Sequence, residues 1–196
     1  MLAFAAAVFL LIITPGPGVL SAAGVGSAFG FRPGIAYVTG LWLGNNLVAL
    51  AVVSGLAALL FSLPWLRTFL LMVSTAYLLY LAAKIAFSGS KIGFIRVEKP
   101  PGFWGGLALQ GVNPKAYVVH TTLMSGFAFL PQNLILEIIL KFIVMNAIWI
   151  PIHLAWLLAG VGLNRLDLTA RTQRIINMTM ALAMLGVVGL AIIFRP

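Results

Sequence analysis

Charged residues are scarce in this chain of 196 residues, and few of the side chains that enzymes use are present. Charged residues make up 8% of the sequence and hydrophobic residues 62%, and the mean hydropathy is +1.12. A soluble domain carries roughly 25% charged residues, so this chain could not cover a surface that faces water. The composition predicts an all-α protein that crosses a membrane several times.

The residue types that build catalytic and metal sites are also rare. The chain has no cysteine, two histidines and three acidic residues. The lack of cysteine excludes disulfides, thiolate metal sites and thiol catalysis. The remaining groups are too few for a nucleophile–base pair, a carboxylate pair or a set of metal ligands. We therefore expect a protein that is not an enzyme and holds no cofactor or metal.

Six apolar runs are long enough to cross a bilayer, which takes about 20 residues in a helix. They cover residues 2–29, 35–63, 66–87, 102–130, 134–163 and 175–194. Together they use nearly the whole chain, so we expect a single membrane domain over 1–196. The longest connection, residues 88–101, is polar, basic and rich in proline, and is predicted to be a loop.

Basic residues are distributed unequally between the two sides of these spans. Arg67 and Arg195 lie on one side, and the loops on the other side hold eight, namely Arg32, Lys84, Lys91, Arg96, Lys99, Arg165, Arg171 and Arg174. Cytoplasmic loops carry an excess of Lys and Arg. The net charge of +9 therefore reports membrane topology rather than a nucleic-acid partner. The unequal distribution of basic residues predicts that both termini lie outside.

Proline and glycine interrupt the first and fourth spans at corresponding places. The first span contains "ITPGPGVL" at 13–20, and the fourth contains "GVNPKA" at 111–116, so that Asn113 follows Thr14 by 99 positions. Each half then holds three spans, repeat one at about 1–87 and repeat two at about 102–196. Because three crossings bring the chain to the opposite side of the membrane, the second half must be inverted relative to the first. Paired interruptions of this kind are typical of inverted-repeat transporters with a site at the midplane.

The local chemistry of the two interruptions suggests a binding site. Thr14 and Asn113 are predicted to cap helices that begin with Pro15 and Pro114. The amino end of each half-helix would attract an anion, and non-helical backbone at this depth is tolerated where it is buried or lines a cavity. A pair of proline kinks that only shapes the bundle is the alternative.

Several polar residues are expected at the same depth. Polar groups inside membranes usually face the bundle interior or a pathway, although an asparagine can also serve only to bond two helices. Lys115 could recognise a substrate carboxylate, or it could bond a carbonyl that Pro114 leaves free. We predict a substrate site formed by Thr14, Pro15, Gly16, Pro17, Asn45, Asn46, Asn113, Pro114, Lys115 and Asn146.

The other ionisable groups of the spans receive separate interpretations. His120 and His153 titrate near neutral pH when unperturbed, and we consider them candidates for a proton relay as well as for packing residues. Glu137 and Lys141 are four residues apart, which favours a structural ion pair on one helix.

Small residues recur every four positions in the first two spans. Such faces let helices approach closely in lipid. We interpret them as packing faces, which are compatible with a homodimer and equally with packing inside one chain. They comprise Gly18, Ala22, Gly26 and Gly30, and then Ala36, Gly40 and Gly44.

The two motifs, their order and the six spans resemble the LysE (lysine exporter) family, including its threonine and homoserine exporter branch. The resemblance covers essentially the full chain. It implies export of amino acids or related metabolites across a bacterial inner membrane, driven by the proton gradient. It carries over to residues 14–17 and to Asn113, Pro114 and Lys115.

The chain departs from the family pattern at two places. Many members have an acidic residue directly after Pro-Gly-Pro, where this chain has Gly18. Many also have an aspartate in the second span, where this chain reads "GLWLGNNL" with Asn45 and Asn46. Proton coupling through a buried aspartate therefore does not carry over to this chain.

The leading interpretation is a secondary exporter, working by alternating access, of a small zwitterionic metabolite such as a neutral amino acid. The lack of a carboxylate at the midplane argues against a cationic substrate. The alternatives are an exporter of another small solute and a non-catalytic membrane assembly subunit, which would explain the small faces but not the matched interruptions.

The charge asymmetry predicts the result of a fusion experiment. A reporter enzyme that is active only in the cytoplasm, fused after residue 196, should be inactive in cells that express the protein, because the C-terminus lies outside. If that fusion is active, the C-terminus lies in the cytoplasm and the predicted topology is wrong.

Overall fold

The computed structural model describes residues 1–14, 16–56 and 99–165, together with single residues between 62 and 83 and between 169 and 182. These residues form helices and no strand, which confirms the all-α prediction for this part of the chain. The spans predicted at 66–87 and 175–194 and residues 88–98 of the loop predicted at 88–101 lie essentially outside the described residues. The helices are α1 (Leu2–Ile13), α2 (Pro17–Phe29), α3 (Phe31–Val53), α6 (Gly102–Val112), α7 (Pro114–Ser125) and α8 (Leu134–Arg165).

The interruptions predicted in the first and fourth spans are confirmed as helix breaks. The first span is the pair α1 and α2, bent by 51° between Ile13 and Pro17. The fourth is divided into α6 and α7 at Asn113. Among the described helices, α3 and α8 are long and apolar enough to cross a membrane, and the bent pair makes up to three such spans.

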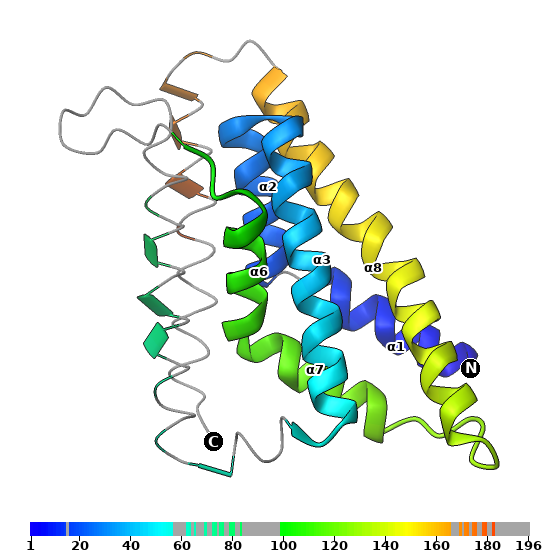
Figure 1. The fold of residues 1–196 in the computed structure, drawn as a ribbon. Coiled ribbons are helices and arrows are strands. Elements are labelled where there is room, and N and C mark those ends of the chain that lie inside the picture. The colour runs from blue at the N-terminus through cyan, green and yellow to red at the C-terminus, as the bar shows by residue number, and fades with distance from the viewer. Residues whose placement is uncertain are drawn as a thin grey trace.

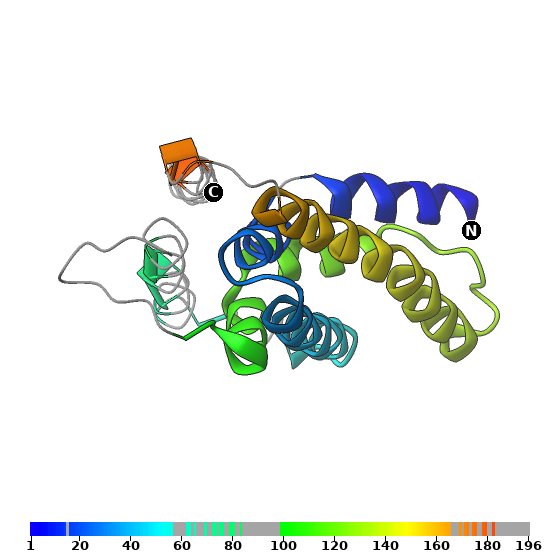
Figure 2. The same cartoon turned by 90° about the horizontal axis from the view of Figure 1, so that it is seen from above.

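The breaks give the described helices two directions. Helices α2, α3, α6 and α8 run alongside one another, whereas α1 and α7 turn away from α2 and α6 (Figures 1 and 2). Helix α1 lies against the first half of α8, and α7 lies against α3. Each broken span therefore contributes to two different parts of the bundle.

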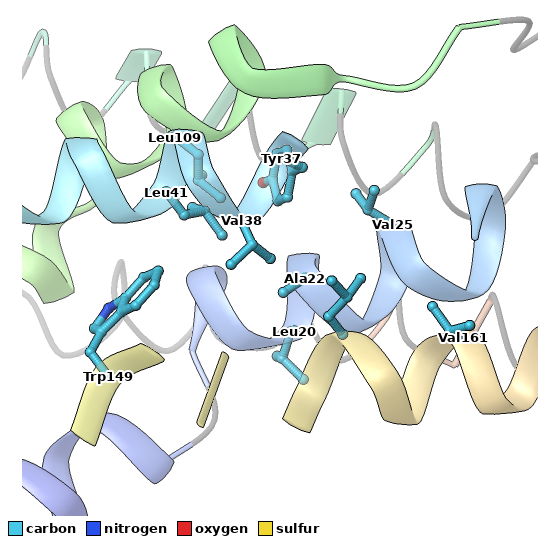
Figure 3. Packing of buried hydrophobic residues seen from close by; sticks show 10 residues of the cluster. Leu20, Ala22, Val25, Tyr37, Val38, Leu41, Leu109, Trp149 and Val161 are labelled. Carbon is cyan, nitrogen blue, oxygen red and sulfur yellow. The ribbon is translucent and has the colours of Figure 1, made fainter. Parts of the chain in front are cut away.

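Two apolar clusters follow this division. The first joins α2, α3, α6 and α8 through side chains that include Val25, Leu41, Leu109 and Val161 (Figure 3). The second joins α1, α7 and the first half of α8. The helix breaks lie between the two clusters, where apolar packing gives way to polar groups.

Glycines allow the close contacts of the first cluster. A Cβ atom at Gly40 would collide with the carbonyl of Phe103, and one at Gly106 with the carbonyl of Tyr37, so α3 and α6 touch backbone to backbone. Gly160 likewise meets the carbonyl of Ala23 where α8 crosses α2. In lipid, helix association depends on such close packing. Of the small residues named from the sequence, Gly26, Gly40 and Gly44 make such contacts with α8 or α6, which confirms packing inside the chain at these positions. Gly30, at the end of the first face, has no atom of the described residues within 4 Å.

The predicted ion pair on α8 is also confirmed. The Nζ atom of Lys141 lies 2.8 Å from a carboxylate oxygen of Glu137, and both side chains are buried. Lys141 also donates to the carbonyl of Met124, at 2.9 Å, and Glu137 accepts from the amides of Phe129 and Leu130. The pair thus fastens the carboxyl end of α7 and the following loop to α8.

The glycine contacts predict a position-specific effect of one methyl group on α6. Gly106→Ala should lower the free energy of unfolding by about 1–3 kcal/mol, because the new Cβ pushes α6 away from α3. Gly111→Ala is the matched control on the same helix, since no atom of the described residues outside the helix's own backbone lies within 4 Å of its Cβ position. Thermal unfolding in detergent measures both variants, and equal melting temperatures would contradict the packing role of Gly106.

Candidate functional site

The first helix break differs from its prediction. Thr14 ends α1 rather than capping the next helix, and its hydroxyl donates to the carbonyl of Leu10 at 2.6 Å. Helix α2 begins at Pro17 with Gly16 as its N-cap, and no side chain caps it. Its first amides have no intrahelical acceptor, and no side chain of the described residues accepts from them. The prediction of a Thr14 cap is wrong because the hydroxyl bonds the preceding turn, and Pro15 lies outside the described residues.

The second break follows its prediction. The Asn113 side chain accepts from the backbone N–H of Lys115 at 3.1 Å, and Pro114 occupies the first helical position of α7. The amino end of α7 is thus capped by its own chain. The two amino ends are therefore not equivalent, and only that of α2 is open to another acceptor.

Lys115 joins the two breaks. Its Nζ atom donates to the carbonyl of Thr14 at 2.6 Å, across 101 positions of sequence. One alternative from the sequence was that Lys115 bonds a carbonyl that Pro114 leaves free. Lys115 does bond a carbonyl at a helix break, but this carbonyl belongs to Thr14 in the first span. Gly16 makes room for this contact, because a Cβ there would lie 2.8 Å from Cδ of Lys115.

A cavity of about 50 Å³ lies at this junction, and all six described helices or the breaks between them contribute to its wall. A water needs roughly 10–15 Å³ of such volume, so the cavity has room for about three to five waters. Most of the predicted site residues come together here. Those that line the cavity are Thr14, Gly16, Asn45, Asn113, Lys115, His120 and His153.

One hydrogen-bonded chain runs along this wall from the second break to α3. Asn113 Oδ1 accepts from a backbone amide, so its Nδ2 donates to Gln110 Oε1 at 3.1 Å. Gln110 Nε2 then donates to Asn45 Oδ1 at 2.9 Å. His120 Nε2 lies 3.0 Å from the same Asn45 oxygen, which can only accept. Nε2 of His120 therefore carries the proton, and its Nδ1 is a buried acceptor without a partner among the described residues.

His153 is held by Trp149 one turn earlier on α8. The two rings stack with centroids 3.5 Å apart and planes 13° from parallel, and His153 Nδ1 lies 3.0 Å from the Trp149 carbonyl. Nδ1 must donate to that carbonyl, so Nε2 of the neutral ring is an acceptor. A Cβ at Gly18 would lie 3.3 Å from this Nε2. The position where many family members are acidic thus faces His153.

Asn46 and Asn146 do not belong to this cavity, which corrects their placement in the site. They form a reciprocal amide pair between α3 and α8, with distances of 2.8 and 3.1 Å. Trp42 Nε1 also donates to Asn146 Oδ1 at 2.7 Å. Both amides point to each other rather than to the breaks, so they bond two helices. Pro17 and Pro114 shape the breaks but do not line the cavity.

Eight of the fifteen residues that line the cavity were not predicted as site residues, and three of these eight lie against predicted ones. Gln110 is a lone amide in an apolar helix, three residues before Asn113, and this spacing could have suggested their contact. Trp149 lies four residues before His153, on the same face of α8. Gly18 carries no side chain, so the sequence offered only its place after Pro-Gly-Pro as a signal.

Comparisons with known proteins identify the family of this chain. A family model described as LysE type translocator matches residues 9–195. The chain belongs to the LysE type translocator family. It is therefore a membrane translocator rather than an enzyme, and the resemblance drawn from the two motifs is confirmed.

Several relatives carry the name cysteine/O-acetylserine efflux protein. That of Salmonella paratyphi A is 36% identical over 153 residues, which is 76% of this chain and 75% of the relative. That of Klebsiella pneumoniae is 32% identical over 170 residues, 85% and 84% of the two chains. The Escherichia coli O1:K1 protein is 33% identical over 159 residues, 79% and 78% of the two chains. No solved structure gives a significant match.

The hydrogen-bonded chain predicts that Asn45 is essential for stability. Asn45→Ala should lower the free energy of unfolding by about 1–3 kcal/mol or more, because two buried donors, on Gln110 and His120, lose their acceptor. Thr39→Ala is the control on the same helix, since the Thr39 hydroxyl bonds only a carbonyl of its own turn. Unfolding in detergent distinguishes them, and an equally mild effect of both variants would refute the network.

Proposed function

We propose that this translocator exports a small zwitterionic amino acid or derivative, of the class to which cysteine and O-acetylserine belong. The observation that carries the proposal is the position of Lys115, which spans two helix breaks beside the uncapped amino end of α2. The printed names of the relatives favour an amino-acid substrate in addition.

The substrate carboxylate binds between Lys115 and the first turn of α2. An ammonium has three N–H donors, and one of those of Lys115 bonds the Thr14 carbonyl. The others remain for a carboxylate, with which charge-assisted bonds are short and strong. The amides of Gly18 and Val19 lie at the open amino end, where the helix dipole favours an anion. Both residues line the cavity.

The rest of the cavity favours a short, uncharged side chain. Its volume of about 50 Å³ admits only a few atoms in this conformation. Leu11, Ile12 and Val119 supply an apolar wall, and no carboxylate lines the cavity among the described residues. A cationic side chain would find no partner there, whereas a small neutral one would meet apolar contacts.

Transport proceeds by alternating access around the breaks, with the two halves as inverted repeats. The breaks occupy corresponding positions in the halves, and a single side chain joins them. The protein lies in the bacterial inner membrane with its basic loops in the cytoplasm. In support, the turn between α2 and α3 and the carboxyl end of α8 lie at one end of the bundle, opposite the α7–α8 loop (Figure 1).

Counterflow in proteoliposomes tests this function. Vesicles loaded with one unlabelled small neutral amino acid should accumulate the labelled form, tried in turn for alanine, serine, cysteine and O-acetylserine. Lys115→Met should weaken the apparent affinity at least about thirtyfold, because loss of one partner of a buried charge contact costs about 2 kcal/mol or more. Lys99→Met, in the exposed segment before α6, is the matched control.

Two outcomes would overturn the proposal. Wild-type protein that is folded and monodisperse but shows no counterflow with any of these solutes would exclude the substrate class. Counterflow that is equally strong in the wild type and in Lys115→Met would exclude the assignment of the carboxylate to Lys115.

A further inference from the structure

We propose that Nε2 of His153 receives the substrate's amino group, and that a proton competes for the same lone pair, so that export is coupled to proton entry. This inference rests on the proposed function and assigns the end of the substrate that Lys115 does not hold. Of the two histidines that the sequence suggested as a proton relay, it assigns this role to His153 and not to His120.

The geometry leaves the Nε2 lone pair free. The bond from Nδ1 to the Trp149 carbonyl and the stacked Trp149 ring hold the imidazole in one orientation and one tautomer. Nε2 has no hydrogen-bond partner among the described residues, although His153 is only 4% exposed. The ring lines the same cavity as Lys115. Since Nε2 opens onto this cavity and is not among the fully enclosed polar atoms without a partner, a ligand in the cavity can reach it, and an ammonium N–H would supply its hydrogen bond.

Glycine at position 18 keeps this atom accessible. A Cβ there would lie 3.3 Å from His153 Nε2 and 3.8 Å from Gln110 Oε1, so even a methyl group would cover the acceptor. With no side chain present, the space between α2 and α8 stays open to a ligand. The amides of the first turn of α2 lie beside the same space, so the two ends of an α-amino acid would meet opposite kinds of group.

His120 does not offer the same opportunity. Its Nε2 is committed to Asn45, and its free Nδ1 is completely enclosed. A ligand could reach that atom only after the surrounding helices rearranged. The lone pair that a substrate can reach in this conformation therefore belongs to His153.

Few ionisable groups lie around His153, so protonation of its ring can control binding. Helices α1, α2 and α6 contain no ionisable side chain, and α3 contributes only Asn45 to the cavity. The remaining ionisable groups that line the cavity are Lys115 and His120, both on α7. No carboxylate of the described chain faces the ring, so the imidazole is the base available to the amino group.

The coupling step balances in atoms and charge. In the inward-facing state the unprotonated Nε2 accepts a hydrogen bond from the substrate ammonium. In the outward-facing state a proton from outside bonds to the same electron pair, and the substrate leaves because two cationic groups cannot share the acceptor. The protonated protein returns inward and releases the proton, so one proton enters for each zwitterion exported.

The pH dependence of binding tests this competition. Apparent affinity in counterflow is measured from about pH 4 to 8, with equal pH on both sides. In the wild type it should weaken by up to about tenfold for each pH unit that the pH falls. His153→Gln should make the profile flat, because an amide can accept a hydrogen bond but does not titrate. His120→Gln should keep the wild-type slope.

A second pair of measurements does not depend on His153→Gln folding. Gly18→Ala should weaken binding of the amino acid more than binding of its des-amino analogue, because the methyl group covers only the acceptor for the amino group. Inhibition of counterflow by the des-amino analogue should not show the pH slope of the amino acid in wild-type protein.

The outcomes separate this inference from the function on which it rests. A wild-type slope that persists in His153→Gln, or that disappears in His120→Gln, overturns the assignment while amino-acid counterflow stands. An identical pH slope for the amino acid and its des-amino analogue also overturns it. Absence of counterflow from folded wild-type protein overturns both.

Discussion

The hydrogen bond from Lys115 Nζ to the Thr14 carbonyl determines how the rest of the structure is arranged. A helix break at bilayer depth frees backbone groups that water cannot reach, and each unpaired group is unfavourable by several kcal/mol. Here the carbonyl freed by one break is bonded by the side chain that follows the other break. The two breaks must therefore lie side by side, and the helices that lead to them must cross at this point. The cavity is the space left where these helices cannot pack.

The two breaks solve the same physical problem in different ways. Asn113 closes the amino end of α7 with its own side chain and passes the remaining amide N–H to Gln110. The first break has no such cap, because the Thr14 hydroxyl turns back to α1. The amino end of α7 is thus capped by a side chain of its own half, which also supplies the polar wall of the cavity. The amino end of α2, in the other half, presents uncapped amides to the cavity. An asymmetric site can arise in this way from two corresponding interruptions.

Predictions from sequence succeeded where a local rule acts and failed where a partner decides. The breaks, the Asn113 cap, the Glu137–Lys141 pair and the glycine packing faces depend on neighbours within one turn or on steric size. Thr14 was predicted to be a cap, but a hydroxyl can bond its preceding turn as readily as the following amides. Asn45 and Asn46 are adjacent in sequence and face different groups, since successive helical residues point about 100° apart. Gln110 and Trp149 gain their roles only from the side chains that they touch.

The sequence by itself determined that this chain is a helical membrane protein with two corresponding breaks, because hydropathy, proline and glycine act through the backbone of a single segment. It also placed Lys115 in one of those breaks. Only the tertiary structure decided that Lys115 bonds the other break, that Asn46 and Asn146 form a clamp outside the cavity, and that His153 faces Gly18. These contacts join residues about 100 or more positions apart, and their geometry depends on how closely the glycines let the helices approach.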